Sequence, residues 1–309
     1  KMFFNINTYT NKKISSRLLW LIDCFIDNLN PSLPTDSDIK IIPFGKGKNK
    51  NTLDVVRGDF HTPSRVLSNI FWSYIDWDRL NKCFDKGISV LDVGCGTGNY
   101  SDFFYQVSGG VVSKYSGIDI FEHEDWKNKY ARENFSFSVG SVDNIKKIYN
   151  NEDMVLSQSV LEHVENDKKL IDSISSIAEK QNKRIIQIHL VPSSTCLYKY
   201  LWHGYRQYTP KKIDLLLKDV KNAKKYLVPL GGKGCNSVHI KWITIPEILS
   251  RIIPFRIENS KNNNSKYTKE RDGAIIFDGE RNLDATKASF YAIIIDHNFN
   301  NQEKSSFIL

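Results

Sequence analysis

The 309-residue sequence has few cysteines, and none of them forms a C-x-x-C pair. The five cysteines are scattered and odd in number, so their spacing predicts neither a zinc site nor a disulfide framework. A reducing compartment, the cytoplasm, is the simplest setting for such a chain. We therefore expect no structural metal and no disulfide bond.

Long apolar runs are also absent, since none approaches the roughly 20 residues that cross a bilayer. The best candidate, Leu18–Ile26, is interrupted by Asp23 and lacks the small-residue cleavage site of a signal peptide. Apolar residues recur on one face over about 13–28, which predicts an amphipathic helix instead of a transmembrane segment. Such a face could dock on a partner or on a second copy of the chain.

Arginine is scarce, with 11 arginines against 32 lysines in a chain that also has 27 asparagines. The net charge of +8 invites a nucleic-acid partner. However, arginine is the residue that makes bidentate contacts with bases and phosphates. The enrichment in lysine and asparagine is typical of an AT-rich genome, so nucleic acid is the less favoured partner.

From Ile88 to Val191, strand-like and helix-like patterns alternate along the chain. The expected strands are 89–93, 115–120, 135–139, 154–157 and 184–191, and the expected helices between them are 100–107, 122–132 and 161–179. This alternation favours a doubly wound α/β fold, a parallel sheet with helices on both faces. Outside this region we expect helices at 63–82, 210–218 and 244–253, strands at 227–230 and 290–295, and an exposed polar loop at 261–270.

The first of these strands runs into a glycine-rich turn with an acid two residues before its first glycine. Glycine lets the backbone turn sharply and lets a ligand approach closely. No lysine follows, as a nucleoside triphosphate loop requires, and Asn99 stands where a dinucleotide fingerprint has glycine. An acid here disfavours phosphates and favours a cation, which indicates the sulfonium and ammonium of S-adenosylmethionine. The expected contacts are Asp92, Gly94, Cys95, Gly96 and Gly98.

The ends of the next strands carry residues suited to a nucleoside. Asp119 lies 25 positions after Gly94, where an acid can accept hydrogen bonds from both ribose hydroxyls, and Ile120 could cover the adenine. After the third strand, the segment at 141–143 could read the edge of the adenine. The residues expected to contact the cofactor here are Ser141, Val142, Asp143 and, at the end of the fourth strand, Ser157.

Residues 91–98, Asp119, 140–142 and 153–164 together resemble the class I S-adenosylmethionine-dependent methyltransferases. The resemblance implies a Rossmann-like sheet of seven strands with the last antiparallel, for which 290–295 is the candidate. It implies a methyltransferase domain at 61–309, with a cofactor-binding core at 88–191 and acceptor-binding elements at 192–285, after an N-terminal extension at 1–60. The family often has an acid at the position of Ser141, so Asp143 would have to hold the adenine amine.

The segment Val160–Val164 is similar to the same segment of small-molecule and sugar O-methyltransferases. This resemblance implies that His163 is a general base, a role that suits an imidazole with its usual pKa of about 6.5. The segment 202–210 looks like those of methyltransferases of surface-glycan assembly, and its aromatic rings and forked donors are typical of sugar binding. The residues expected to bind the acceptor are Glu162, His203, Tyr205, Arg206 and Tyr208.

These features predict an S-adenosylmethionine-dependent methyltransferase that methylates an oxygen of a sugar or glycan intermediate in surface polysaccharide assembly. An RNA methyltransferase is one alternative, favoured by the net charge. It lacks the Asn/Asp-Pro-Pro-aromatic motif of base-amine methylation, since Ser157-Gln158-Ser159-Val160 stands there. The other alternative is a non-catalytic scaffold of methyltransferase fold that docks through the N-terminal helix. The intact glycine loop with both acids argues against it.

Overall fold

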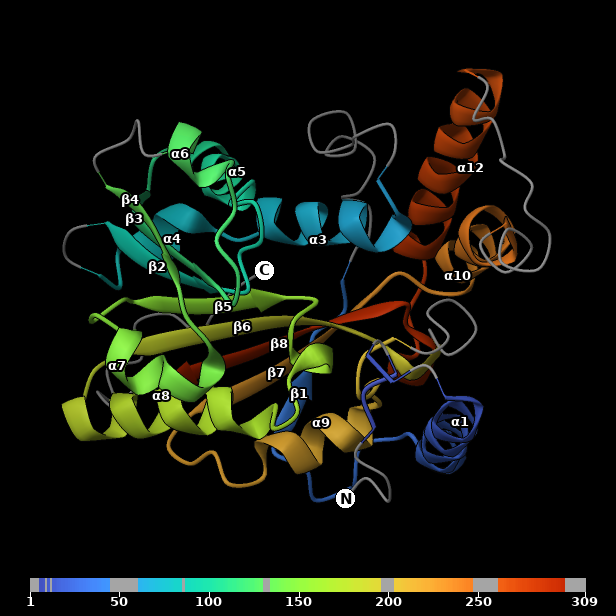
Figure 1. Cartoon of the computed structure of the whole chain (residues 1–309), viewed down its shortest axis with the longest axis horizontal. Helices are drawn as coiled ribbons and strands as arrows, with labels where there is room; N and C mark the ends of the chain where they lie inside the picture. Colours follow the sequence, from blue (N-terminus) through green and yellow to red (C-terminus); the bar gives the residue numbers. More distant parts are fainter. Residues whose placement is uncertain are drawn as a thin grey trace.

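The computed structural model describes residues 6–8, 10, 11, 13–44, 61–84, 87–129, 134–195, 203–246 and 261–297. A single eight-stranded sheet runs through this part of the chain, in the order β1-β7-β8-β6-β5-β2-β3-β4 (Figure 1). The strands are β1 (Ile39–Ile41), β2 (Ile88–Val93), β3 (Val112–Asp119), β4 (Phe135–Val139), β5 (Met154–Gln158), β6 (Ile185–Pro192), β7 (Lys224–Leu230) and β8 (Phe290–His297). Only the pairings of β8 with β6 and β7 are antiparallel. The expected doubly wound fold and its antiparallel closing strand are confirmed.

Helices cover both faces of the sheet (Figure 1). On one face lie α3 (Pro63–Ser73), α4 (Trp77–Asn81), α5 (Tyr100–Val107) and α6 (Trp126–Lys129), and on the other lie α7 (Ile145–Ile148), α8 (Lys168–Gln181) and α9 (Pro210–Leu217). Each face has its own buried apolar cluster. Strands β2, β5, β6 and β8 are buried on both sides, which is why their sequences are nearly continuous apolar runs.

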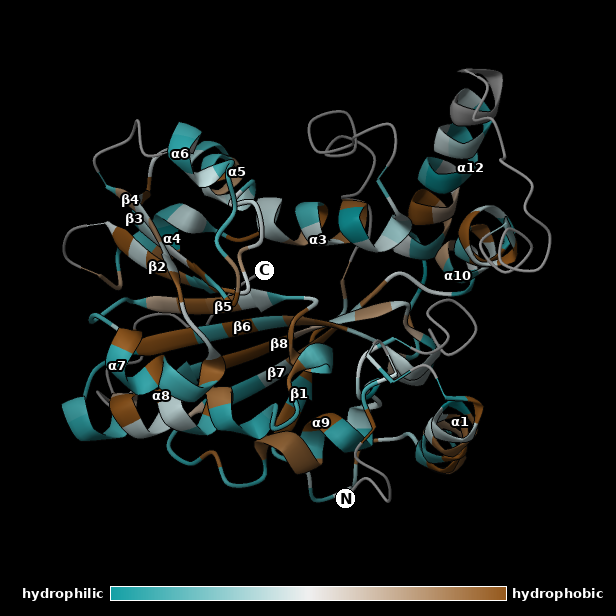
Figure 2. Ribbon diagram, in the orientation of Figure 1, coloured by the Kyte–Doolittle hydropathy of each residue, from teal (hydrophilic) through white to brown (hydrophobic). Residues whose placement is uncertain are grey.

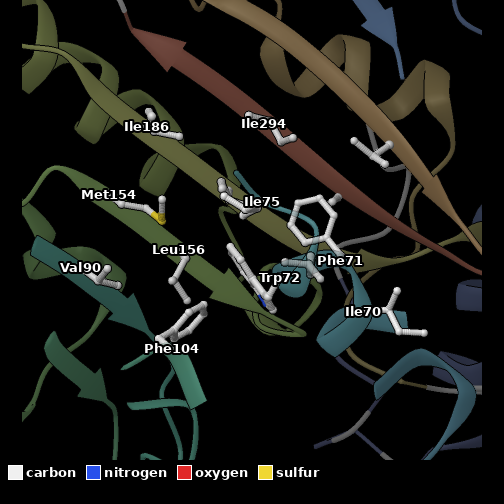
Figure 3. Packing of buried hydrophobic residues seen from close by; sticks show 14 of the residues in the cluster. Ile70, Phe71, Trp72, Ile75, Val90, Phe104, Met154, Leu156, Ile186 and Ile294 are labelled. Atoms are coloured by element: carbon white, nitrogen blue, oxygen red, sulfur yellow. The ribbon is translucent and has the colours of Figure 1, made fainter. Parts of the chain in front are cut away.

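Helix α3 is tied closely to the centre of the sheet. Thr62 caps it by accepting a hydrogen bond from the Arg65 amide at 3.2 Å, and Pro63 occupies its first turn. Its Trp72 ring packs edge-to-face on Phe104 of α5, with 4.8 Å between the centroids, over Met154 and Leu156 of β5 (Figure 3). The Trp72 contacts hold the last turns of α3 against the centre of the sheet.

Several sequence predictions need correction. The sheet has eight strands, not seven, because Ile39–Ile41 in the N-terminal extension pairs with β7. The polar segment expected as a loop at 261–270 is the first half of helix α12 (Lys261–Gly279). The buried side chains that anchor α12 come later, at Arg271, Ile275 and Asp278, so the polar first half gave no helical pattern. Helix α8 begins at Lys168, after a 3-10 turn (Leu161–His163), because Asp167 caps it.

Helix α12 also orders the segment after β7. The carboxylate of its Asp278 accepts hydrogen bonds from the amides of Gly232 at 2.7 Å, Cys235 at 2.8 Å and Gly234 at 2.9 Å. These amides open helix α10 (Lys233–His239), which continues as a π-helix (Ile240–Thr244). The helix expected at 244–253 falls partly on this segment, and its residues from 247 lie outside the described part of the chain.

The predicted amphipathic helix is α1 (Ile14–Leu29). Trp20 and Cys24 lie on its buried side, whereas Ile14, Leu18 and Phe25 are among the apolar residues exposed along it (Figure 2). Docking of this face on a partner stays a prediction. No helix in the described ranges is both long and apolar enough to cross a membrane.

The described cysteines are Cys24, Cys83, Cys95 and Cys235, and Cys196 lies outside the described residues. None of these four thiols forms a disulfide.

A buried histidine makes stability depend on pH. His189 of β6 is wholly buried, with Nδ1 at 2.8 Å from Ser157 Oγ and Nε2 at 3.3 Å from Gln187 Oε1. Burial lowers its pKa to about 3, whereas an unfolded histidine titrates near a pKa of about 6.5. Between these values the unfolded chain binds a proton that the folded chain does not, so His189 makes stability fall as the pH falls.

We therefore expect His189→Gln to reduce the acid sensitivity of folding. The free energy of unfolding should depend on pH less steeply in the variant, by about 1.4 kcal/mol per pH unit between roughly pH 4 and 6. Urea unfolding of both proteins across this range measures the two slopes. Equal slopes would show that His189 is charged in the folded protein.

Candidate active site

A pocket of about 930 Å³ opens at the carboxyl ends of the central parallel strands. Val93, the last residue of β2, pairs with Ile118 of β3 on one side and Ser157 of β5 on the other, so three strands end together. The chain proceeds outward from β2 through β3 and β4, and then returns to β5 on the opposite side. Ligands of open α/β sheets bind at such a point of reversal.

The glycine loop forms the floor of this pocket. Gly94, Gly96 and Gly98 have φ angles of +77°, +54° and +74°, which only glycine adopts cheaply. A Cβ on Gly94 would lie 2.3 Å from a methyl of Val160, so close packing against the loop after β5 demands glycine there. A Cβ on Gly96 would meet nothing within 4 Å, and this backbone is open to a ligand.

Asp119 and Trp126 hold the glycine loop in place. The Asp119 carboxylate accepts a hydrogen bond from the Gly96 amide at 2.8 Å, and the Trp126 indole donates to the Gly96 carbonyl at 2.8 Å. The Trp126 ring stacks on Phe137 of β4 at 5.6 Å. Beside Asp119, the side chains of Ile120 and Phe121 are 61% and 68% exposed at the pocket wall, where they offer an apolar surface to a flat ring.

A smaller cavity of about 170 Å³ adjoins the glycine loop and is lined by Arg65, Asp92 and Cys95. Asp92 is buried and accepts a hydrogen bond from the Tyr115 hydroxyl at 2.5 Å. Burial raises the pKa of Asp92 to about 7, which the hydrogen bond from Tyr115 opposes. A cationic group bound here would favour the ionised carboxylate, and the Arg65 guanidinium would attract a carboxylate.

These two cavities fit S-adenosylmethionine. Gly94, Gly96 and Gln158 line both, so one extended ligand can span them. The small cavity offers opposite charges to the ammonium and carboxylate of the amino-acid part, and Asp119 with its apolar neighbours suits the adenosine. Of the residues predicted to bind the cofactor, the large pocket is lined by Gly94, Gly96, Asp119, Ile120, Ser141, Val142 and Asp143, and the small one by Asp92 and Cys95.

The structure places two predicted cofactor contacts elsewhere. Ser157 is fully buried and bonds to His189, so it supports the strand end without lining either cavity. Gly98 makes the turn into α5, where its carbonyl accepts hydrogen bonds from the amide and hydroxyl of Ser101. Asp143 lines the large pocket but forms an ion pair with Lys169. Ser157 differs from expectation because adjacent residues of a strand point to opposite faces of the sheet, so that Gln158 faces the cavities instead.

Beyond β5 the pocket wall carries the predicted catalytic residue. His163 lines the pocket, and its ring packs edge-to-face on His203 with 4.5 Å between the centroids. Burial, and secondarily His203, lower the pKa of His163 to about 4. Glu162 is buried, and burial raises its pKa to about 8. Burial thus favours the neutral forms of both side chains, whereas the sequence analysis assigned His163 its usual pKa of about 6.5.

Two residues predicted to bind the acceptor belong instead to the protein interior. Arg206 is 3% exposed and donates hydrogen bonds to the carbonyls of Val164 at 2.6 Å and Glu165 at 2.5 Å. Tyr208 is fully buried, and its hydroxyl donates to Asp167 at 2.8 Å. Both side chains hold the loop that follows β5, and neither lines the pocket. The Tyr205 ring packs against the Arg206 guanidinium, 5.5 Å from its centroid.

Sequence reasoning missed several residues that line the site. Gln158 accepts a hydrogen bond from the Trp72 indole at 2.9 Å and faces both cavities. Ser159 has a φ of +55°, unusual for a residue with a side chain, and lines the pocket. Arg65 lies 27 positions before Asp92, and only the packing of α3 brings it to the loop. No local spacing signals these contacts.

Part of the chain is similar to a known protein family. Residues 84–225 match a family model described as a methyltransferase domain. This match indicates a methyltransferase domain in that part of the chain. The match supports methyltransferase activity, and the two cavities described above fit S-adenosylmethionine as the methyl donor. No curated protein matches the sequence significantly.

Several solved structures resemble the chain at low sequence identity. The plantazolicin methyltransferase BpumL, in complex with a triazolic desmethylPZN analog and SAH, is 13% identical with a TM-score of 0.46, over 80% of this chain and 88% of that one. The related BamL complex is 15% identical with a TM-score of 0.45, over 75% and 85%. Coclaurine N-methyltransferase, bound to N-methylheliamine and SAH, is 11% identical with a TM-score of 0.38, over 92% and 89%.

The position of Asp119 leads to a prediction on cofactor binding. Asp119→Ala removes the carboxylate proposed to accept hydrogen bonds from the ribose, and it releases the Gly96 amide. The loss of about 1–3 kcal/mol should weaken binding of S-adenosylhomocysteine roughly 5- to 150-fold. Calorimetry measures the affinity, with Asp172→Ala as the matched control because Asp172 is a partly exposed acid that lines neither cavity. An unchanged affinity in Asp119→Ala would remove Asp119 from the cofactor site.

Proposed function

We propose that this methyltransferase acts on a hydroxyl group of a sugar or glycan intermediate in surface polysaccharide assembly. The observation that carries the proposal is the polar wall that follows β5, where His163, Glu165 and Asn166 line the pocket. Imidazole, carboxylate and carboxamide groups together donate to and accept from hydroxyls. The volume of about 930 Å³ is near the upper end of the roughly 300–1,000 Å³ typical of small-molecule sites. It leaves room for an acceptor beside the cofactor.

The charge of the wall supports a neutral acceptor. No lysine or arginine is among the described residues that line the large pocket, whereas Asp119, Asp143 and Glu165 are. Carboxylates repel a polyanion such as RNA, so the net charge of +8 is not concentrated where an RNA acceptor would enter. Arg206 is buried and cannot hold an anionic group of the acceptor. We therefore expect an acceptor glycan that is neither acidic nor phosphorylated.

The proposed mechanism rests on positioning. When bound, S-adenosylmethionine supplies an electrophilic methyl group on a sulfonium. Arg65 and Asp92 hold the charged tail of the cofactor, Asp119 holds the ribose, and the open backbone at Gly96 allows close approach. His163, which lies in the wall after β5, would accept the proton of the acceptor hydroxyl as its oxygen takes the methyl group. Correct placement of two reactants accounts for a large share of the rate in such displacements.

Methyl transfer from deuterium-labelled S-adenosylmethionine tests the proposal. The purified chain is incubated with neutral mono- and oligosaccharide glycosides and with single-stranded RNA, and products are analysed by mass spectrometry. We expect the label on a sugar hydroxyl and none on RNA. Labelled RNA with unmodified sugars would favour the nucleic-acid alternative. Tight binding of S-adenosylhomocysteine without transfer to any acceptor would favour the non-catalytic scaffold.

A further inference from the structure

Three side chains with metal-ligand chemistry meet at the acceptor side of the pocket. Glu162, His163 and His203 each place one possible ligand atom within 4.8 Å of the other two, within the described part of the chain. Ligand atoms of one ion bound at about 2.0–2.2 Å lie roughly 3–4 Å apart. Small side-chain rotations therefore suffice to bring all three atoms onto a single ion.

Glu162 supplies an independent observation. Its side chain is 1% exposed, and its Oε2 atom has no hydrogen-bond partner. A buried carboxylate oxygen without a partner is costly. A cation bound between Glu162 and the two histidines would satisfy this oxygen, because a metal ion takes the place of the missing donor.

The backbone holds His203 firmly against the other two residues. Gly204 has a φ of +69°, and a Cβ there would lie 2.4 Å from the Glu162 carbonyl, so only glycine allows this approach. The Tyr205 amide donates to the same carbonyl at 2.7 Å. From the N-terminal segment, the Thr8 amide donates to the Gly204 carbonyl at 3.1 Å, and the Trp20 indole donates to the Tyr205 carbonyl at 3.1 Å. A ligand set fixed in this way is preorganised.

We propose that Glu162, His163 and His203 bind a divalent transition-metal ion at the acceptor side of the pocket. Two imidazoles and one carboxylate are the ligand set of catalytic zinc sites and of non-haem iron sites, whereas Mg²⁺ prefers oxygen ligands alone. Three protein ligands leave coordination positions open. Since His163 lines the pocket, an acceptor hydroxyl can reach an open position. This catalytic meaning rests on the proposed function, whereas the metal site itself does not.

This metal site was not predicted from the sequence, where the cysteine spacing fits no zinc site and no structural metal was expected. His203 follows His163 by 40 positions, a separation that matches no short metal-binding motif. In this reading His163 is a ligand, and the metal takes over the task of polarising the acceptor hydroxyl.

Metal titration of the full chain tests the site. The protein is stripped with a chelator and titrated with Zn²⁺ by calorimetry and with Co²⁺ by visible absorption. We expect one ion per chain. Glu162→Gln, His163→Ala and His203→Ala should each weaken binding by more than the roughly 10- to 100-fold that loss of an outer partner costs. His123→Gln is the matched control, because His123 lines the same pocket away from the cluster, and it should bind as the wild type does.

Binding of S-adenosylhomocysteine is measured for every variant, so that loss of the metal site can be distinguished from loss of the cofactor site. A chain that binds S-adenosylhomocysteine normally but takes up neither Zn²⁺ nor Co²⁺ would overturn the metal site and leave the methyltransferase function standing. Metal binding that survives in all three cluster variants would also overturn it. Stoichiometric metal binding lost in the three variants, in a chain that methylates no sugar, would support the site and overturn the proposed acceptor.

Discussion

Replacement of His163 by alanine is expected to lower the rate of methyl transfer to the acceptor about 10²- to 10⁴-fold, with the affinity for S-adenosylhomocysteine close to that of the wild type. His163 lines the pocket after β5, whereas the groups proposed to hold the cofactor follow β2 and β3 or come from α3. Removal of a group that acts on the reacting hydroxyl should lower kcat and kcat/KM together. Steady-state kinetics and calorimetry measure the two effects separately.

His203→Ala shows how His163 acts. If His163 binds a metal ion together with His203, the two variants should lose similar amounts of activity. If His163 acts alone as the base, His203→Ala should cost far less, since the His203 ring would then pack against that of His163, at 4.5 Å, without taking part in the proton transfer. His123→Gln controls for loss of a pocket imidazole outside the cluster. Full glycan methylation by His163→Ala would show that another residue acts on the hydroxyl.

The core of the fold was predictable because its signals are local. Strands β2, β5 and β6 are buried on both faces and read as apolar runs, and the glycine loop is a contiguous motif with Asp119 at a familiar distance. Elements stabilised by distant contacts were not predictable. Strand β1 has three residues and exists only as a partner of β7, and the polar half of α12 follows from anchors further along the helix.

Residue composition alone did not predict which side chains of segment 202–210 reach the acceptor side of the pocket. Tyrosine and arginine next to histidine are common in sugar sites, but the same residue types also build buried polar networks. Only the structure reveals that Arg206 and Tyr208 converge on Asp167, whereas His203 turns toward His163. Residues 203–208 fold onto residues 161–167. This packing buries Arg206 and Tyr208, which were predicted to bind the acceptor, and it also brings together the cluster that we propose to bind metal.

The buried Arg206 should matter for stability, not for acceptor affinity. Its guanidinium lies 3.2 Å from the Asp167 carboxylate and donates to carbonyls of the loop after β5. Arg206→Ala removes the cationic partner of Asp167, leaves these carbonyls without the guanidinium donor in a buried setting, and opens a cavity. We expect the free energy of unfolding to fall by about 3–5 kcal/mol, the usual cost of breaking a buried ion pair. Urea unfolding measures this loss.

The surface pair of Lys169 and Asp143 provides the matched control. Both side chains are largely exposed to solvent, at 42% and 75%, so Lys169→Ala should cost less than about 1 kcal/mol. Arg206→Lys should recover little of the loss, because a single ammonium cannot reproduce a planar fork that reaches two carbonyls and a carboxylate. A stable Arg206→Ala protein with only a raised acceptor KM would return Arg206 to the acceptor site, since a buried clamp cannot be removed without loss of stability.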